Sequence, residues 1–452
     1  MKLEDLLGFG HVSMCGIWAG NKKAEKKKRI TTIMSQFTEF YSKVCVAGSV
    51  KFVIDEASKE EISLSESDHF SRNLATILAR DSEVVAVNLK ILPNKCRIYI
   101  SKNSRWLDGD VKYIDKIKGL MTNLSKDAPM KFVQATERED VPDLILNIFE
   151  YCSEKLRRRL DKLKKDIRNN KDESYTKSFL EFLEASEINV GNLDEIDEYE
   201  IAMACCEYYK KNKNNENYPQ RFLGHIKKVG SYSASVMDIV DCARKEKYKT
   251  SFSNIDLHLL DPIHVDQPIS SWNDIIKEFI PNQKNLEDFK KNCLKNYETR
   301  RRINKIYGGT GRQLDHETTN HMYLHAELNI LTNTDILSKK HNEFIAVSKN
   351  SCYLCESFIK FLRSKGYKIT ISGVCKKLYP GWKLPDTYSE EFVENVLCDL
   401  DEIIESGIEQ HTKIIAKSDS DGESADSDNP EQIYIVMKKV SKVASAKANS
   451  NL

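Results

Sequence analysis

The chain has no long uninterrupted apolar run. Although 40% of its 452 residues are hydrophobic, no apolar run approaches the roughly 18 residues that a membrane-spanning helix needs. We therefore expect no membrane span. Residues 1–6 contain an acidic pair and no extended apolar core, so the sequence also predicts no secretory signal.

Neither sign of charge predominates. The chain has 69 Lys and Arg against 68 Asp and Glu, for a formal net charge of +1. A protein dedicated to wrapping nucleic acid would be basic over its whole surface, so the balance argues against that class and leaves only local basic faces open. Length and polarity indicate a soluble globular protein of two to three domains, or one domain with a large insertion.

Most of the twelve cysteines stand singly rather than in a disulfide framework. Cys96, Cys152, Cys242 and Cys398 lie within apolar patterns, where a reduced thiol behaves as a small hydrophobic group. Without a secretory signal, this usage predicts a reducing, intracellular compartment, either cytoplasm or nucleus. It leaves one Cys-x-x-Cys pair for metal chemistry.

That pair follows a His-x-Glu motif. The chain reads His325-Ala326-Glu327 and then Cys352-Tyr353-Leu354-Cys355. His325, Cys352 and Cys355 are three plausible zinc ligands, and three protein ligands leave an open position, as catalytic zinc sites do. Zinc acidifies a water at that position, and Glu327 could carry its proton to a leaving amine. Zinc deaminases have this signature, with a proline where this chain has Ser351.

Two other interpretations compete with the catalytic site. In the first, the zinc is structural and closed by a fourth ligand, either His321 or Cys375. In the second, the two cysteines belong to the core and the histidine to the surface. Neither explains Glu327, and neither His321 nor Cys375 has a spacing typical of a fourth ligand.

The expected local structure brings the motif residues together. His325 and Glu327 begin one predicted helix, Glu343–Val347 reads as a strand, and Cys352 begins a second helix. A parallel crossover places both helix starts at the same sheet edge. Thiolates at such a start also gain from the positive end of the helix dipole.

A helix and a β-hairpin are predicted far upstream. Ser67 or Asp68 can cap a helix, and the strand-like runs Val84–Ile91 and Cys96–Ser101 follow it, joined by a Pro-Asn turn. The hairpin ends near Asn103.

The stretch 104–320 reads as mostly helical. Its clearest segment is Pro142–Arg168, with apolar residues at helical spacing and a basic remaining surface. That surface could follow a phosphate backbone, but a solvated helix exterior is the preferred interpretation. Another helical segment is expected at Trp272–Arg302.

Over Met322–Gly373 the residues resemble the cytidine-deaminase-like superfamily, which carries His-Ala-Glu and Cys-x-x-Cys at the starts of two helices beside a sheet. Ser348-Lys349-Asn350-Ser351-Cys352 is most similar to the fungal and bacterial OTT-type deaminase-like family. By that resemblance the zinc ligands are His325, Cys352 and Cys355, and the proton shuttle is Glu327. Ser351 in place of the frequent proline is expected to loosen the turn before Cys352.

The resemblance implies an α/β fold: a three-layer α-β-α core with a mixed sheet. Because the helix and hairpin that should precede the His motif are found only upstream, we expect a large helical insertion to split this core. The expected regions are an N-terminal helical region (1–65), the first part of the core (66–103), the insertion (104–320), the second part with the zinc site (321–410), and a disordered acidic, Ser-rich segment and tail (411–452). Asn103 would then contact the substrate, with a turn-capping role as the alternative.

The leading hypothesis is a zinc-dependent hydrolytic deaminase. Its substrate would contain a nucleobase, cytosine or adenine, as a nucleoside or within single-stranded nucleic acid. The alternative is a catalytically inactive, zinc-stabilised scaffold that binds partners. A deaminase effector used between competing organisms ranks last, because export domains are missing from the chain.

Overall fold

The structure, a computed structural model, describes residues 18–54, 63–308, 311–338 and 341–413. Its chain contacts divide it into two compact units. Of the described residues, the first unit combines 18–50, 266–308, 311–320 and 388–412, and the second combines 51–54, 63–265, 321–338, 341–387 and 413. Within the described ranges, no helix is both long and apolar enough to cross a membrane.

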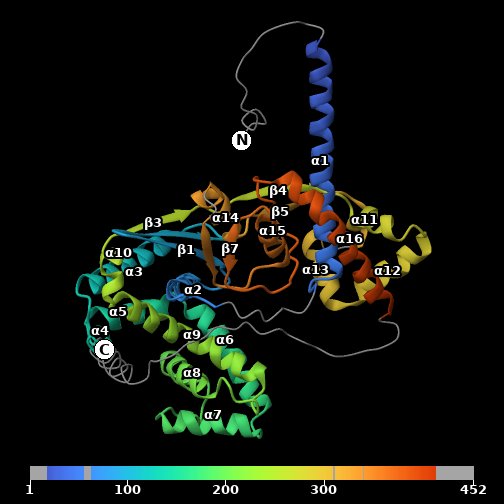
Figure 1. The fold of residues 1–452 in the computed structure, drawn as a ribbon. Helices are drawn as coiled ribbons and strands as arrows, with labels where there is room; N and C mark the ends of the chain where they lie inside the picture. Colours follow the sequence, from blue (N-terminus) through green and yellow to red (C-terminus); the bar gives the residue numbers. More distant parts are fainter. Residues whose placement is uncertain (1–17, 55–62, 309–310, 339–340, 414–452) are drawn as a thin grey trace. The chain divides into compact units, whose positions relative to one another are not determined.

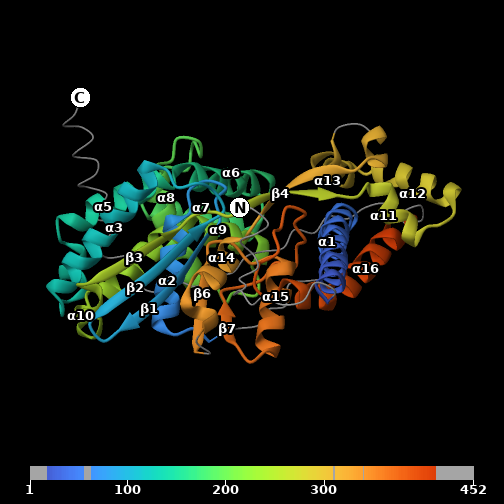
Figure 2. The same ribbon diagram turned by 90° about the horizontal axis from the view of Figure 1, so that it is seen from above.

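A five-stranded mixed sheet forms the centre of the second unit, so the fold is mixed α/β with mostly helical content (Figures 1 and 2). Its order is β3-β2-β1-β6-β7. The strands are β1 (Val85–Leu92), β2 (Lys95–Lys102), β3 (Ile255–Leu260), β6 (Asn342–Val347) and β7 (Lys368–Ile371). Strand β1 is antiparallel to both β2 and β6, whereas β3 is parallel to β2 and β7 to β6. The carboxyl ends of β2, β3, β6 and β7 therefore share one sheet edge.

The predicted helix and hairpin are present. Helix α2 (Glu66–Leu78) begins after Ser65 rather than after Ser67 or Asp68, because Ser65 and Asp68 form a reciprocal capping box. The hairpin closes with Leu92 opposite Lys95. At its other end β1 pairs with β6, so residues far apart in the chain complete one sheet.

Strand β3 lies inside the stretch expected to be helical. It pairs along its length with β2, from Ile255 opposite Cys96 to Leu260 opposite Ser101. Its sequence, Ile-Asp-Leu-His-Leu-Leu, has the alternation of a half-buried strand over only six residues, which the surrounding helical pattern obscured. The helical segment that precedes it comprises α3 (Asp108–Lys126), α4 (Phe132–Thr136), α5 (Asp140–Tyr151), α6 (Ser153–Asn169), α7 (Ser174–Ala185), α8 (Glu198–Asn212), α9 (Gln220–Ala243), η1 (Glu246–Tyr248) and α10 (Lys249–Phe252).

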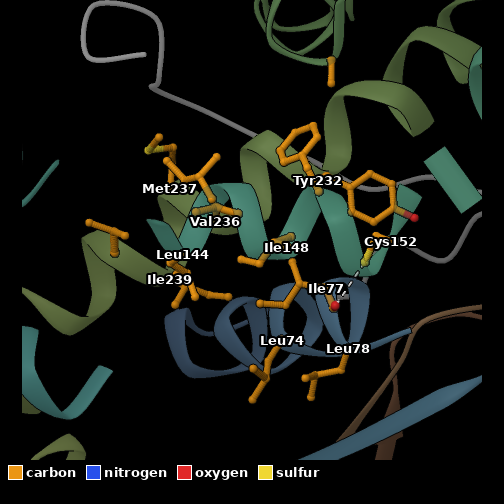
Figure 3. Close-up of a cluster of buried hydrophobic side chains, with 14 of the residues drawn as sticks. Leu74, Ile77, Leu78, Leu144, Ile148, Cys152, Tyr232, Val236, Met237 and Ile239 are labelled. Atoms are coloured by element: carbon orange, nitrogen blue, oxygen red, sulfur yellow. Dashed lines mark hydrogen bonds between the residues drawn. The ribbon is translucent and has the colours of Figure 1, made fainter. Parts of the chain in front are cut away.

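The helix expected over Pro142–Arg168 is two helices, α5 and α6. Cys152 ends the first and precedes the second with φ −96° and ψ 4°, outside the helical region. Its thiol donates a hydrogen bond of 3.3 Å to the carbonyl oxygen of Ile77 on α2 (Figure 3). The break thus places the α5–α6 junction against α2.

The largest hydrophobic core lies among α2, α5, α6 and α9 and continues onto the sheet. Figure 3 shows Ile77 of α2 pointing toward Ile148 of α5, on the side where Val236 of α9 lies, whereas Leu74 lies on the opposite side of α2. All four side chains are at most 2% exposed. Burial of that apolar surface is the main force that fixes α2 and α9 together.

Helices cover both faces of the sheet. Ile98 and Ile100 of β2 face Leu74 of α2. The next residue, Ser101, has a hydroxyl that receives a hydrogen bond from Asn329 on α14 (Ala326–Asn333). Since successive strand residues point to opposite faces, α2 and α14 lie on opposite sides of the sheet (Figure 1). Helix α15 (Tyr353–Ser364) packs against β7.

The first unit is helical. It contains α1 (Trp18–Val50), α11 (Trp272–Phe279), α12 (Gln283–Lys295), α13 (Tyr297–Tyr307), η2 (Gly311–Asp315) and α16 (Ser389–Lys413). The helix expected over Trp272–Arg302 is therefore three helices. Trp272 is fully buried, and its indole nitrogen donates to Ser49 Oγ over 3.1 Å.

Two short strands and one short helix complete the described chain. Strands β4 (His264–Ile269) and β5 (Thr318–Tyr323) form a two-stranded sheet, and η3 (Asp335–Ser338) follows α14. Residues 266–320, expected to be part of the insertion, group with α1 instead. Of the expected tail at 411–452, residues 414–452 lie outside the described part.

The cysteines that the structure describes are free thiols. Cys96, Cys152 and Cys242 are buried, as their apolar neighbours predicted. Cys398 is exposed, because it lies on the outer face of α16 between the buried residues Val396 and Leu400.

Candidate metal centre

Three potential metal ligands meet at the starts of two helices. His325 directly precedes α14, and Cys352 directly precedes α15. His325 Nδ1 lies 3.5 Å from Cys352 Sγ and 3.2 Å from Cys355 Sγ. The donor atoms of all three residues lie within 4.8 Å of one another, close enough to bind one metal ion.

Backbone geometry presents the sulfur atoms. Cys352 acts as the N-cap of α15, and its sulfur accepts a hydrogen bond from the backbone N–H of Cys355 over 3.4 Å. The first turn of a helix has unpaired N–H groups and a partial positive charge, both of which favour a thiolate. The predicted convergence of the two helix starts is therefore present.

The three donors also influence one another's protonation. Burial disfavours a charged Cys352, but its hydrogen bond with Cys355 and the neighbouring His325 lower the pKa of the Cys352 thiol to about 6. Burial likewise disfavours a charged His325, yet the nearby Cys352 raises the pKa of the imidazole to about 9. Burial raises the pKa of Cys355 well above its ordinary value.

Glu327 is an unusual carboxylate. Its residue is 2% exposed, and its Oε2 has no hydrogen-bond partner in the structure. The negative charge of Glu327 acts to raise the pKa of His325, Cys352 and Cys355, although other groups lower the pKa of Cys352 overall. Glu327 therefore lies close to all three. A buried acceptor without a partner is costly, and such groups concentrate at functional sites. The expected catalytic glutamate thus lies beside the ligand group with one oxygen unused.

Two aromatic side chains complete the surroundings of the site. The indole nitrogen of Trp382, fully buried, donates to Cys355 Sγ over 3.2 Å. The Tyr379 ring packs edge-on against His325 with centroids 6.1 Å apart. Sequence reasoning identified neither residue. A tryptophan in a loop that follows a core strand is the signal that could have found Trp382.

The turn before Cys352 is tied down rather than loosened. The N–H of Ser351 donates to the carbonyl of Gly373 over 2.9 Å, and the Ser351 carbonyl accepts from Cys375 N over 2.9 Å. These bonds form a parallel bridge. Because proline has no N–H, the serine makes a bond that the frequent proline could not make. The expected loosening is therefore wrong.

The alternative fourth ligands lie outside the donor group. Among the described residues, that group consists of His325, Cys352 and Cys355 alone. His321 is exposed on β5, where its ring packs against His264 and Tyr323. The arrangement favours three protein ligands over four.

Asn103 has a structural contact. Its side-chain oxygen accepts a hydrogen bond of 2.8 Å from Val84 N, and its own N–H donates to the Val84 carbonyl over 3.1 Å. These bonds hold together the open end of the hairpin.

Three arginines of the basic surface of α6 are paired with carboxylates. Arg157 contacts Glu154 and Glu198, Arg158 contacts Asp81, and Arg168 contacts Asp194. This pairing agrees with the preferred interpretation of a solvated helix exterior.

Comparison with known proteins gives one match. Residues 324–386 match the family model OTT_1508_deam, which describes a deaminase-like family. No curated protein matches the chain, and no solved structure does. The matched segment begins one residue before His325 and includes Cys352, Cys355 and Trp382. Over these residues the chain is similar to the OTT-type deaminase-like family that its motifs resemble, and this similarity suggests a deaminase.

Proposed function

We propose that the protein is a zinc-dependent hydrolytic deaminase that acts on a nucleobase. One observation carries the proposal: three donors of zinc-binding type lie close together, and the buried Glu327, whose Oε2 has no hydrogen-bond partner, is near enough to influence the charge of all three. The β-sheet with α2 on one face and α14 and α15 at the other would be a three-layer, cytidine-deaminase-like core.

The donor set fits zinc. One imidazole nitrogen and two thiolates are a common ligand combination for Zn²⁺, and three protein ligands leave one position for substrate chemistry. His325, Cys352 and Cys355 would hold the ion, with Trp382 donating to one of the sulfurs. When bound, zinc acts as a Lewis acid that makes water a nucleophile at neutral pH.

Glu327 would move the protons. Its free Oε2 can accept a proton from the attacking water and pass it to the ring nitrogen of the base. The same oxygen then carries the second water proton to the exocyclic nitrogen. Water oxygen thereby forms a bond to the ring carbon, the bond from that carbon to the amine breaks, and ammonia leaves. The base keeps a carbonyl in place of its amine.

Burial of the site supports this chemistry. Cys352, Cys355 and Glu327 are buried and His325 is half-buried, and limited access of bulk water strengthens the electrostatic interactions of a carboxylate at such a site. A cytosine or adenine ring carries the amine that such a site can displace. These two bases are the proposed substrates, as nucleosides, nucleotides or parts of a single strand.

A metal assay coupled to an ammonia-release screen tests the proposal. Purified protein should contain about one zinc per chain, as the single three-donor group requires, and should release ammonia from cytidine, adenosine, their nucleotides or single-stranded DNA or RNA. The Glu327→Gln protein should keep its zinc and lose conversion by about 10²–10⁴-fold, the contribution that general acid–base catalysis typically supplies.

A matched carboxylate provides the control. Glu356 on α15 is also buried, but both of its oxygens lie 2.8 Å from Lys376 Nζ. Glu356→Gln should reduce stability and leave conversion per folded molecule within a few fold. Equal losses in the two variants would contradict the role of Glu327. Zinc binding without ammonia release from any substrate would favour the scaffold alternative.

A further inference from the structure

A polar pocket lies in the second unit, apart from the candidate metal centre. It is formed by α2, α6 and α9 together with the ends of β6 and β7, and its empty volume, open solvent included, is about 790 Å³. None of its lining residues belongs to the metal centre. Its cationic lining residues are Arg72, Arg159, Lys227, Lys228 and Lys349.

The pocket lining has one sign of charge. It has five Arg and Lys residues, His69 and several hydroxyl and amide side chains, and it includes no Asp or Glu. The chain as a whole has almost equal numbers of basic and acidic residues. A lining of cations and neutral hydrogen-bond donors is suited to an anion, and specifically to the oxygens of a phosphate group.

Arg159 is held in position within this lining. One of its guanidinium nitrogens donates to the carbonyl of Lys228 over 2.8 Å and to Ser231 Oγ over 2.9 Å. The guanidinium also lies 5.0 Å from the centroid of the Tyr232 ring. A guanidinium fixed in this way loses little entropy when it binds phosphate oxygens.

Positive charge is also concentrated behind and within the pocket. Burial lowers the pKa of Arg72 to about 10. Lys155, buried on α6, has its pKa lowered to about 7 by burial and then by the neighbouring charges of Arg159 and Lys349. Cations that repel one another in a partly buried space are stabilised when an anion binds among them.

The pocket and the metal centre share a sheet edge. Val347 and Ser348, at the end of β6, line the pocket, as do Lys349 and Asn350. The chain then reaches Cys352 two residues later, at the start of α15. The loop of residues 348–351 thus separates the basic pocket on the α2 side from the metal ligands on the α14 side.

We infer that the basic pocket binds a phosphate group of the substrate, so that the base is converted as part of a phosphate ester rather than as a free base or nucleoside. The inference rests on the proposed deaminase function only in identifying the bound phosphate ester as the substrate. Phosphate binding by the pocket stands without it.

Equilibrium binding to the full-length Glu327→Gln protein tests the inference, because it needs no turnover. The probes are cytidine, cytidine monophosphate, adenosine, adenosine monophosphate and a fluorescent single-stranded oligonucleotide. We expect at least one phosphorylated probe to bind about tenfold or more tightly than its nucleoside, the gain that one charge-assisted contact supplies. A preference for a mononucleotide or for the oligonucleotide identifies the source of the phosphate.

Paired double variants assign the effect to the pocket. Lys228→Gln with Lys349→Gln should weaken the phosphorylated probe about tenfold or more and leave nucleoside binding unchanged. Lys162→Gln with Lys165→Gln removes the same charge from exposed positions of α6 outside the pocket, and binding should stay within about twofold. Lys228→Arg with Lys349→Arg should retain binding.

Each outcome has a defined meaning. Equal affinity for nucleosides and phosphorylated probes, or equal effects of the pocket and α6 variants, would overturn the inference even if ammonia release is observed. Pocket-dependent phosphate binding without ammonia release would support the pocket and contradict the deaminase proposal. The two proposals can therefore fail separately.

Discussion

The indole nitrogen of Trp382 donates a hydrogen bond to Cys355 Sγ over 3.2 Å. Trp382 lies after β7, at a position where it also bridges to Tyr323, two residues before His325. One buried side chain thus connects the loop after the sheet to a sulfur of the metal centre. A donor to a ligating sulfur orients it and adjusts its charge, so this contact has a measurable consequence.

Trp382→Phe should weaken zinc binding. The variant keeps an aromatic ring, although a smaller one, and removes the N–H. Loss of such an outer contact costs about 10–100-fold in metal affinity. Competition with a chromogenic chelator measures the change. Trp272→Phe is the control, because it removes another buried indole N–H, donated to Ser49, in the first unit. Equal affinities for zinc in wild type and Trp382→Phe would contradict the prediction.

Ser351→Pro should destabilise the turn that presents Cys352. It restores the residue frequent in the resembled family but removes the N–H that donates to Gly373. Loss of that buried bond should lower the free energy of unfolding by about 1–3 kcal/mol and reduce zinc occupancy. Ser351→Ala keeps the N–H and removes only a buried hydroxyl without a hydrogen-bond partner, so it should be neutral or stabilising. Urea denaturation distinguishes the two, and a stabilising proline would refute the assignment.

Asn329→Ala should weaken the attachment of α14 to the sheet. The Asn329 side chain donates to Ser101 Oγ over 2.8 Å and to the carbonyl of Asp261 over 2.9 Å. Removing both bonds should cost about 2–3 kcal/mol of stability, because the acceptors stay buried or part-buried. Asn333→Ala, at an exposed position one turn later, should cost under about 1 kcal/mol in the same urea titration. A smaller loss for Asn329→Ala than for Asn333→Ala would contradict the role of this contact.

Lys155→Met should stabilise the protein near neutral pH and change its pH dependence. The folded-state pKa of Lys155 is about 7, below the ordinary value of 10.5. The unfolded chain therefore binds a proton more readily, and stability is greatest above 10.5 and falls as the pH decreases toward 7. The wild-type free energy of unfolding thus decreases by on the order of a few kcal/mol between these pH values. Lys155→Met lacks this decrease, because methionine has no proton to bind.

Urea denaturation at several pH values measures this effect. The free energy of unfolding of Lys155→Met should exceed that of the wild type most at pH 7 and below, and the difference should decrease as the pH approaches 10. Lys165→Met, at an exposed position of α6, should show little change at any pH. A constant difference between Lys155→Met and wild type across this range would show that packing, not charge, is responsible.

Much of the local structure around the site could be predicted from the sequence. The strand-like runs Val84–Ile91 and Cys96–Ser101 predicted β1 and β2 to within a residue, because apolar, β-branched runs joined by a Pro-Asn turn are typical of a hairpin. Helix ends were less accurate. Ser65 caps α2 through a box with Asp68, which depends on side-chain geometry that several nearby residues could supply.

The long helical middle shows where periodicity fails. Cys152 separates α5 from α6 although apolar spacing continues across it, since its thiol and backbone fit against Ile77. Strand β3 was missed because six residues within a helical context do not carry enough pattern to identify a strand. In both places contacts with distant parts of the chain overrode local preference.

The sequence by itself determined the chemistry of the candidate centre. His325, Cys352 and Cys355 are donors whose types and placement at two helix starts already specify a metal-binding group, and Glu327 is defined by its place beside them. Only the tertiary structure decided that Trp382 contacts Cys355, that Ser351 is tied to Gly373, and that cations from three helices line one pocket. The physical reason is distance along the chain. The types of the candidate ligands are given by short sequence motifs. A pocket, or a hydrogen bond to a ligand from a distant residue, exists only after long-range packing has brought its members together.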